Sequence, residues 1–86
     1  MNVRNIVIAA LEKTTGLMNS PTLAPIILSG GDFDLSELGV DSLTTYEIIM
    51  LLEDEVGVEI APSTLMSAKT LSELVSLIEL TIHAKV

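Results

Sequence analysis

The residues that could do chemistry in this sequence are Asp41 and Ser42, a carboxylate directly before a hydroxyl in the stretch GVDSLTTYEII (residues 39–49). A serine nucleophile needs a neighbouring base to take its proton. The chain has one histidine, His83, far along the sequence. The Gly-x-Ser-x-Gly elbow of hydrolases is absent, since Thr44 stands at its second glycine and no strand is expected before the serine. We therefore reject catalysis by Ser42 and do not expect an enzyme.

A metal site is also not expected. The chain has no cysteine, so thiolate ligands and disulfides are excluded. Asp32, Asp34 and Ser36 alternate as the first ligands of a calcium loop do. That loop requires glycine at its sixth position and a bidentate glutamate at its twelfth, where this chain has Glu37 and Leu43. We therefore reject a specific calcium site.

Two interpretations of the Asp41–Ser42 pair remain. In the first, the pair serves only as a cap, because both residue types suit the start of a helix. Alternatively, the N–H groups and partial positive charge at a helix N-terminus favour a phosphate. An exposed hydroxyl there suits the attachment of a phosphodiester-linked arm by another enzyme, which explains a serine without catalytic neighbours.

The elements that position this pair are predicted to be helices. Apolar residues at helical spacing and helix-stop glycines predict helices near 2–15 and 41–56, with Gly16 and Gly57 following them. Pro62 suits the first turn of a short helix near 62–68, and Thr70 to Glu73 form a capping box that starts the last helix. We find no strand pair. The prediction is an all-α, four-helix bundle in one domain (1–86), with three main helices and a short third one.

The connection between the first two helices, roughly residues 17–40, is rich in turn formers and unusually long. We predict a long loop that its apolar residues pin across the bundle: Leu17, Leu23, Ile26, Ile27, Leu28, Phe33, Leu35 and Leu38.

The predicted helix 41–56 has two apolar faces. At about 100° per residue, Ile48, Ile49, Leu52 and Val56 share the core face. A second face is either packed under the long loop or free for docking, with apolar anchors and an acidic rim that selects basic partners. Its residues, with exposed Met66 of the short helix, are the predicted docking residues: Leu43, Tyr46, Glu47, Met50, Glu53 and Asp54.

Charge and composition limit the classes of partner that the chain can bind. The net charge is −8 with four basic residues, which excludes a phosphate-binding stripe for nucleic acid and favours basic protein partners. No apolar run approaches the roughly 20 residues of a membrane helix, so we expect no membrane insertion and a cytoplasmic monomer. Hydrophobic residues make up 49% of the chain, which indicates apolar surface left for a partner or cargo.

The segment LSELGVDSLTTYEIIMLLEDEVGVEI (residues 35–60) closely resembles the acyl carrier protein family. That family has an L-G-x-D-S-L motif, an amphipathic helix with acidic residues near its end, and then G-[VI]-x-I. The resemblance covers about residues 3–80. The matching residues are Leu38, Gly39, Asp41, Ser42, Leu43, Glu47, Met50, Leu52, Glu53, Gly57, Val58 and Ile60.

The resemblance implies that Ser42 would carry 4'-phosphopantetheine, transferred from coenzyme A by a phosphopantetheinyl transferase. Asp41 would help that transferase position its metal and substrate. The arm's thiol would hold an acyl or aminoacyl thioester, loaded by a ligase and passed to downstream synthase or transferase enzymes. Leu65, Ala68, Leu71 and Leu74 are expected to line a cavity for the cargo between helices 41–56 and 62–68.

Three features depart from carriers of fatty acid biosynthesis. Thr44 replaces an acid, Tyr46 replaces a small aliphatic residue, and the segment 62–69 has no acid. These departures favour a specialised free-standing carrier of a lipid, polyketide or amino-acid-loading pathway. The alternative is a cofactor-free helical interaction module that uses Leu43, Tyr46 and Met50.

Overall fold

The computed structural model describes residues 2–84, and the regular elements within them are helical. The bounds are α1 (Val3–Thr15), η1 (Leu17–Asn19), α2 (Leu23–Leu28), η2 (Leu35–Leu38), α3 (Ser42–Val56), α4 (Pro62–Ser67) and α5 (Leu71–Ala84), where η marks a 3₁₀ turn. The predicted all-α class is confirmed. The helices expected near 2–15, 41–56 and 62–68 lie within about two residues of their predicted bounds.

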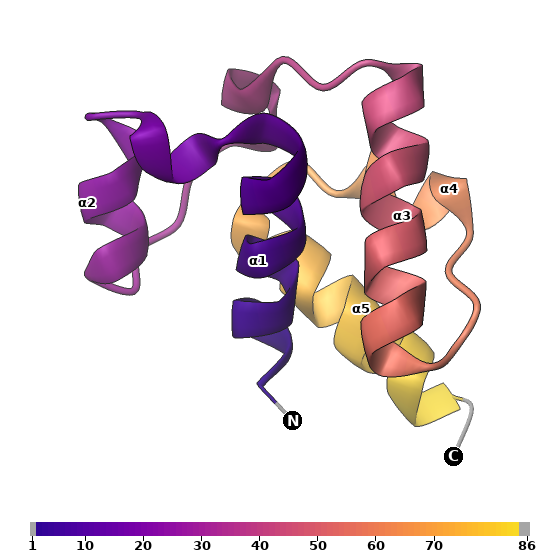
Figure 1. The fold of residues 1–86 in the computed structure, drawn as a ribbon. Coiled ribbons are helices and arrows are strands. Elements are labelled where there is room, and N and C mark those ends of the chain that lie inside the picture. Colours follow the sequence, from indigo (N-terminus) through magenta and orange to yellow (C-terminus); the bar gives the residue numbers. More distant parts are fainter. Residues whose placement is uncertain (1, 85–86) are drawn as a thin grey trace.

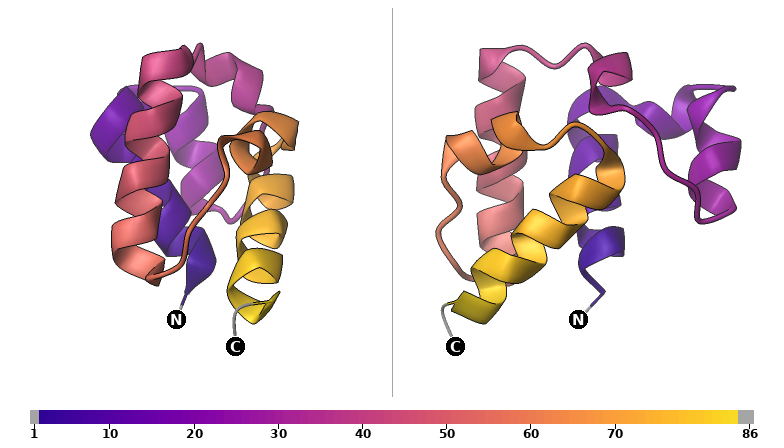
Figure 2. Two further views of the ribbon diagram at one scale, coloured as in Figure 1. Left: turned by 90° about the vertical axis from the view of Figure 1, so that its right-hand side faces the viewer. Right: turned by 180° about the vertical axis from the view of Figure 1, so that it is seen from behind.

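The three long helices form the body of the molecule. Figure 1 shows α1 and α3 side by side, and α5 passing behind both of them. The two further views in Figure 2 show α4 beside α3 and above the start of α5. The core lies between α1, α3 and α5, where burial of aliphatic side chains provides most of the stabilisation. Its most deeply buried residues are Val7, Leu11, Ile48, Leu52, Leu71, Leu74 and Ile78.

Local signals in the sequence account for the ends of the long helices. Asn2 caps α1 by accepting a hydrogen bond from the Asn5 N–H, and Gly16 ends that helix with φ 67°. Gly57 ends α3 in the same left-handed conformation, with φ 74°. A residue with a Cβ is strained at such angles, so glycine is the residue expected at both stops.

The prediction of a plain loop over residues 17–40 is wrong. The segment contains α2 and two 3₁₀ turns, and Figure 1 shows α2 projecting to one side of the bundle. Pro25 indicated a turn, but it lies in the first turn of α2, where its missing N–H costs no helical hydrogen bond. Leu23 and Ile27 are buried as expected, whereas Leu28 is 77% exposed and does not pin the segment.

The C-terminal part of this connection is fixed to α5. The Asp32 carboxylate accepts hydrogen bonds from the Phe33 N–H and, across 40 residues of sequence, from the Ser72 N–H, both at 2.9 Å. The Leu71 N–H donates to the Phe33 carbonyl at 3.1 Å. These bonds hold the end of the connection against the first turn of α5, and thereby place the residues that lead into α3.

The predicted capping box at the start of α5 forms with one difference. The Glu73 N–H donates to the Thr70 hydroxyl at 3.2 Å, as expected. The Glu73 carboxylate accepts at 2.7 Å from the Lys69 N–H rather than from the Thr70 N–H. Within residues 2–84, no helix has the length and apolar character needed to cross a membrane.

Candidate functional site

Ser42 is the first residue of α3 and its side chain is exposed. Asp41 is the N-cap, and its carboxylate accepts a hydrogen bond from the Thr44 N–H at 2.8 Å. The Thr45 hydroxyl donates to the Asp41 carbonyl, also at 2.8 Å. Both groups fix the backbone around Ser42, so the predicted cap is confirmed and the serine hydroxyl is held at the N-terminus of a 15-residue helix.

The electrostatics of the cap keep Asp41 ionised at neutral pH. The Thr44 N–H and then the Thr44 hydroxyl donate to its carboxylate and hold its pKa below the usual aspartate range. Hydrogen bonds to a carboxylate favour its charged form. A full negative charge therefore lies on the residue next to Ser42.

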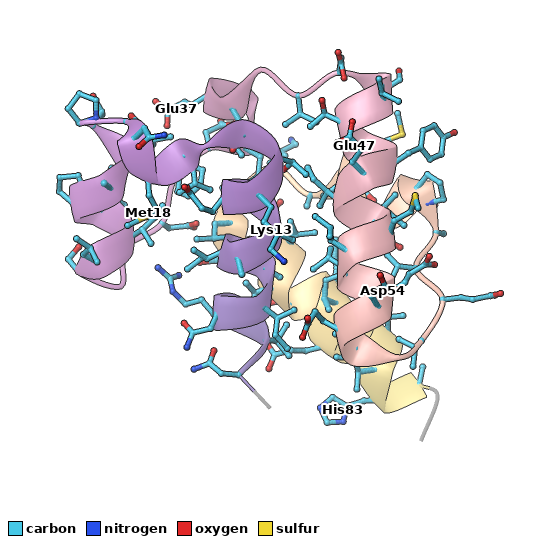
Figure 3. The ribbon with its side chains drawn as sticks, viewed as in Figure 1. Lys13, Met18, Glu37, Glu47, Asp54 and His83 are labelled. Atoms are coloured by element: carbon cyan, nitrogen blue, oxygen red, sulfur yellow. The ribbon has the colours of Figure 1, made fainter. Side chains whose placement is uncertain are left out.

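Among residues 2–84, no histidine lies near this serine. Figure 3 shows His83 beside the C-terminal end of α3, whereas Ser42 is at the N-terminal end of that helix. Within residues 2–84, no group of three or more His, Cys, Asp or Glu side chains is placed to hold a metal ion. The geometry therefore suits a hydroxyl that another enzyme modifies.

A groove of about 470 Å³ opens beside Ser42 between η2, α3 and α4. Its lining includes Asp41 and Ser42 themselves, and its remaining residues are mainly apolar: Leu35, Val40, Thr45, Ile48, Leu65, Met66 and Ala68. An exposed hydroxyl at the mouth of an apolar groove fits a covalently attached arm with an apolar cargo.

The predicted lining of the cavity between α3 and α4 is right in part, and its use for cargo stays a prediction. Leu65 and Ala68 line the groove, but Leu71 and Leu74 are fully buried in the core and do not reach it. The sequence interpretation missed Val40 and Thr45. Thr45 lies four residues after Asp41. At this helical spacing a hydroxyl can bond back to the cap carbonyl, and that was the available signal.

The second apolar face of α3 is free. The side chains of Leu43, Tyr46 and Met50 are 69%, 55% and 65% exposed, and Met66 on α4 is 72% exposed. The alternative that this face packs under the long connection is therefore wrong. Glu47 and Asp54 are also exposed, and Figure 3 shows both on α3.

Glu53 differs from the other predicted docking residues. Its side chain is partly buried, and its carboxylate accepts a hydrogen bond from the Ile60 N–H at 2.8 Å. This bond spans the turn between α3 and α4. Glu53 therefore has a structural contact that the amphipathic pattern did not reveal.

Comparison with known proteins decides the family. A family model described as "Phosphopantetheine attachment site" matches residues 24–78. The chain belongs to the acyl carrier protein family. It is 40% identical over 52 residues to the acyl carrier protein of Sinorhizobium fredii, covering 60% of this chain and 67% of that one.

Two further relatives differ in how much of their length the chain matches. The chain is 25% identical over 79 residues to an acyl carrier protein homolog of Ureaplasma parvum, covering 92% of each. It is 41% identical over 49 residues to chloroplastic acyl carrier protein 2 of Spinacia oleracea, covering 57% of this chain and only 38% of that protein. No solved structure gives a significant match.

Family membership establishes the class of function. Acyl carrier proteins are non-catalytic carriers, and this member carries 4'-phosphopantetheine as a covalent group. It interacts with a phosphopantetheinyl transferase and with acyl-handling enzymes. The cofactor-free interaction module is left without support as the whole function of the chain.

Proposed function

We propose that Ser42 is the residue that carries the 4'-phosphopantetheine arm. The observation that carries this proposal is its exposed hydroxyl at the first position of α3, beside the ionised Asp41 and at the mouth of the groove. When bound, the arm supplies a thiol that holds the cargo as a thioester. Asp41 then has a second role beyond the cap, in recognition by the transferase.

The cargo that this groove favours is an acyl group. The Thr45 hydroxyl, which lines the groove, already donates to the Asp41 carbonyl. Ile48, Leu65 and Ala68 add apolar walls, so an apolar chain gains more from burial here than a charged amino group does. An aminoacyl cargo is the second candidate.

A specialised lipid or polyketide pathway fits the surface of α4 better than a general fatty-acid pathway. Residues 62–67 carry no charge, and Met66 is largely exposed. Partners would contact the exposed apolar residues Leu43, Tyr46, Met50 and Met66. They would place basic side chains near Glu47 and Asp54, which lie on α3 with the first three of these residues. Glu53 would contribute to this acidic surface while it keeps its bond to Ile60.

The first prediction tests the attachment residue by intact mass. Unmodified protein is incubated with coenzyme A, magnesium and a broad-specificity phosphopantetheinyl transferase. We expect one phosphopantetheine increment in the wild type and none in Ser42→Ala, because the acceptor oxygen is gone. Ser63→Ala is the matched control, since Ser63 is an exposed serine in the first turn of α4.

The controls separate loss of the site from loss of the fold. Both variants should keep the helical circular-dichroism spectrum and the cooperative thermal unfolding of the wild type. Labelling of Ser42→Ala, or loss of labelling in a folded Ser63→Ala, would show that the attachment residue is assigned wrongly.

A further inference from the structure

A second groove lies between α1 and α3, outside the attachment site. It has a volume of about 330 Å³, and none of its lining residues lines the groove beside Ser42. The two small side chains Ala9 and Ala10 on α1 leave this hollow next to Leu51 of α3. Figure 1 shows no helix crossing in front of α1 and α3 on this side, whereas α5 covers their other side.

The groove continues along α3 toward the exposed Met50. A hollow of about 240 Å³ is lined by Glu47, Met50, Leu51 and Asp54, and it shares its last two residues with the α1–α3 groove. The combined surface therefore has an apolar floor and an exposed apolar side chain at one end. It adjoins the proposed docking residues of α3.

The two walls of the groove carry opposite charges. Lys13 lines it from α1, and Asp54 and Glu55 line it from α3, with Glu47 further along the same helix. Figure 3 shows Lys13 and Asp54 on the two facing helices. All four side chains are exposed, so their charges are available to a partner.

We propose that this α1–α3 groove binds a helix of a partner protein with an apolar ridge flanked by arginine or lysine on the side that faces α3. A helix fits because the groove follows about two turns of α1, from Asn5 to Lys13, which matches anchors at helical spacing. The backbone groups of α1 and α3 are bonded within their helices, so there is no edge for a strand to extend.

Charge complementarity selects this occupant over two others. A second copy of the chain brings a net charge of −8 with only four basic residues, and would place acids against the α3 wall. An anionic lipid surface is repelled by the same acids. A basic amphipathic helix pairs with Asp54 and Glu55 and buries its ridge on Ile6, Ala10 and Leu51.

The test uses a synthetic helical peptide of about 18 residues, with leucines along one face, arginines on one side of them and glutamates on the other. A peptide of the same composition with the leucines scattered around the helix measures net-charge attraction alone. Binding to the unmodified protein is followed by isothermal titration and by amide chemical-shift changes.

Ala9→Arg is the blocking variant, because Ala9 is exposed and lines the groove, so a long side chain there fills the space that the leucine ridge of the peptide needs. Ala84→Arg makes the same change of charge at an exposed position near the end of α5. We expect Ala9→Arg to weaken binding by at least about tenfold. Ala84→Arg and Ser42→Ala should stay close to the wild type.

Several outcomes would overturn the proposal. They are no binding of the patterned peptide, equal binding of the scattered peptide, equal losses in Ala9→Arg and Ala84→Arg, or shift changes centred on Met66 rather than on α1 and α3. Self-association without peptide that Ala9→Arg abolishes would replace the partner helix by a second copy. None of these results depends on the arm, so failure here leaves the assignment of Ser42 untouched.

Discussion

At the level of the single residue, Asp41 has an observed role as the cap of α3 and a proposed role in recognition by the transferase, and substitution can separate the two. Its carboxylate caps α3 through the Thr44 N–H, and its charge lies next to the proposed attachment hydroxyl. Asparagine caps a helix about as well as aspartate does, whereas alanine does not. Asp41→Asn therefore removes only the charge, whereas Asp41→Ala removes both the charge and the cap.

The second prediction follows from this difference. We expect Asp41→Asn to keep most of the thermal stability but to be modified more slowly by the transferase, because the charge beside Ser42 is lost. Asp41→Ala should be modified slowly and should also unfold at a lower temperature. The measurements are initial labelling rates by mass spectrometry and melting curves. If Asp41→Asn is labelled as fast as the wild type, Asp41 serves only as the cap.

The residues of the proposed attachment site were predictable as a helix start because their signals are local. Asp41 and Ser42 could be placed at a helix start from their types and from the apolar run that follows. The groove beside them depends on η2 and α4, which are brought to α3 by contacts distant in sequence. Val40 could therefore not be assigned to the groove, and the spacing of Thr45 indicated only its bond to the cap carbonyl. Leu71 and Leu74, which have the right character, belong to the core instead.

At the level of the elements, the long helices and the short α4, which begins at Pro62, were predicted well, whereas α2 and the two 3₁₀ turns were not. The apolar spacing and glycine stops of α1 and α3 are local signals that mark the extent of these helices in the sequence itself. The six-residue α2 is too short to be stable by itself, so its formation depends on the burial of Leu23 and Ile27. Its sequence, with Pro25 and no charge, therefore resembles a loop.

The third prediction concerns the turn between α3 and α4. The bond from the Ile60 N–H to Glu53 holds the start of the segment that leads to α4, and Ile60 itself is buried. We expect Glu53→Ala to lower the free energy of unfolding by about 1 kcal/mol, because it leaves a partly buried N–H without its partner. Urea denaturation measures this change.

Asp54→Ala is the matched control, because it removes an exposed neighbouring acid with no hydrogen bond of this kind. It should leave the unfolding free energy nearly unchanged. Equal effects of the two substitutions would mean that removal of a negative charge, rather than the bond to Ile60, governs the stability of the turn.

At the scale of the whole molecule, charge has two opposing effects on stability. Twelve acidic residues against four basic ones give a net charge of −8, and this self-repulsion destabilises the compact state at neutral pH. The carboxylates of Asp32, Asp34 and Asp41 act in the opposite direction, because hydrogen bonds in the folded state lower their pKa values. Partial burial alone would raise the pKa of Asp32, but the N–H groups of Ser72 and Phe33 outweigh it and the pKa is lowered.

The fourth prediction is a stability maximum in mild acid. The pKa values of Asp34 and Asp41 are also lowered, in each case mainly by a backbone N–H, from Ser36 and Thr44 respectively. A carboxylate with a lowered folded-state pKa stabilises the fold above its unfolded value of 3.8, and this contribution is lost as the pH falls below it. Acidification also reduces the net charge of −8 and so relieves self-repulsion, so stability should rise on mild acidification and then fall as the three stabilising charges are lost.

A triple variant tests this balance, since asparagine at positions 32, 34 and 41 keeps an acceptor oxygen but removes the charges whose protonation causes the acid limb. At neutral pH the variant has weaker hydrogen bonds at these three positions, because their acceptors are no longer charged. It also has less self-repulsion, because three negative charges are removed. Melting temperatures between pH 7 and pH 2 should therefore fall less steeply below 3.8 in the variant than in the wild type. Parallel curves across that range would show that these carboxylates contribute no more than the other acids, and that repulsion alone sets the response to pH.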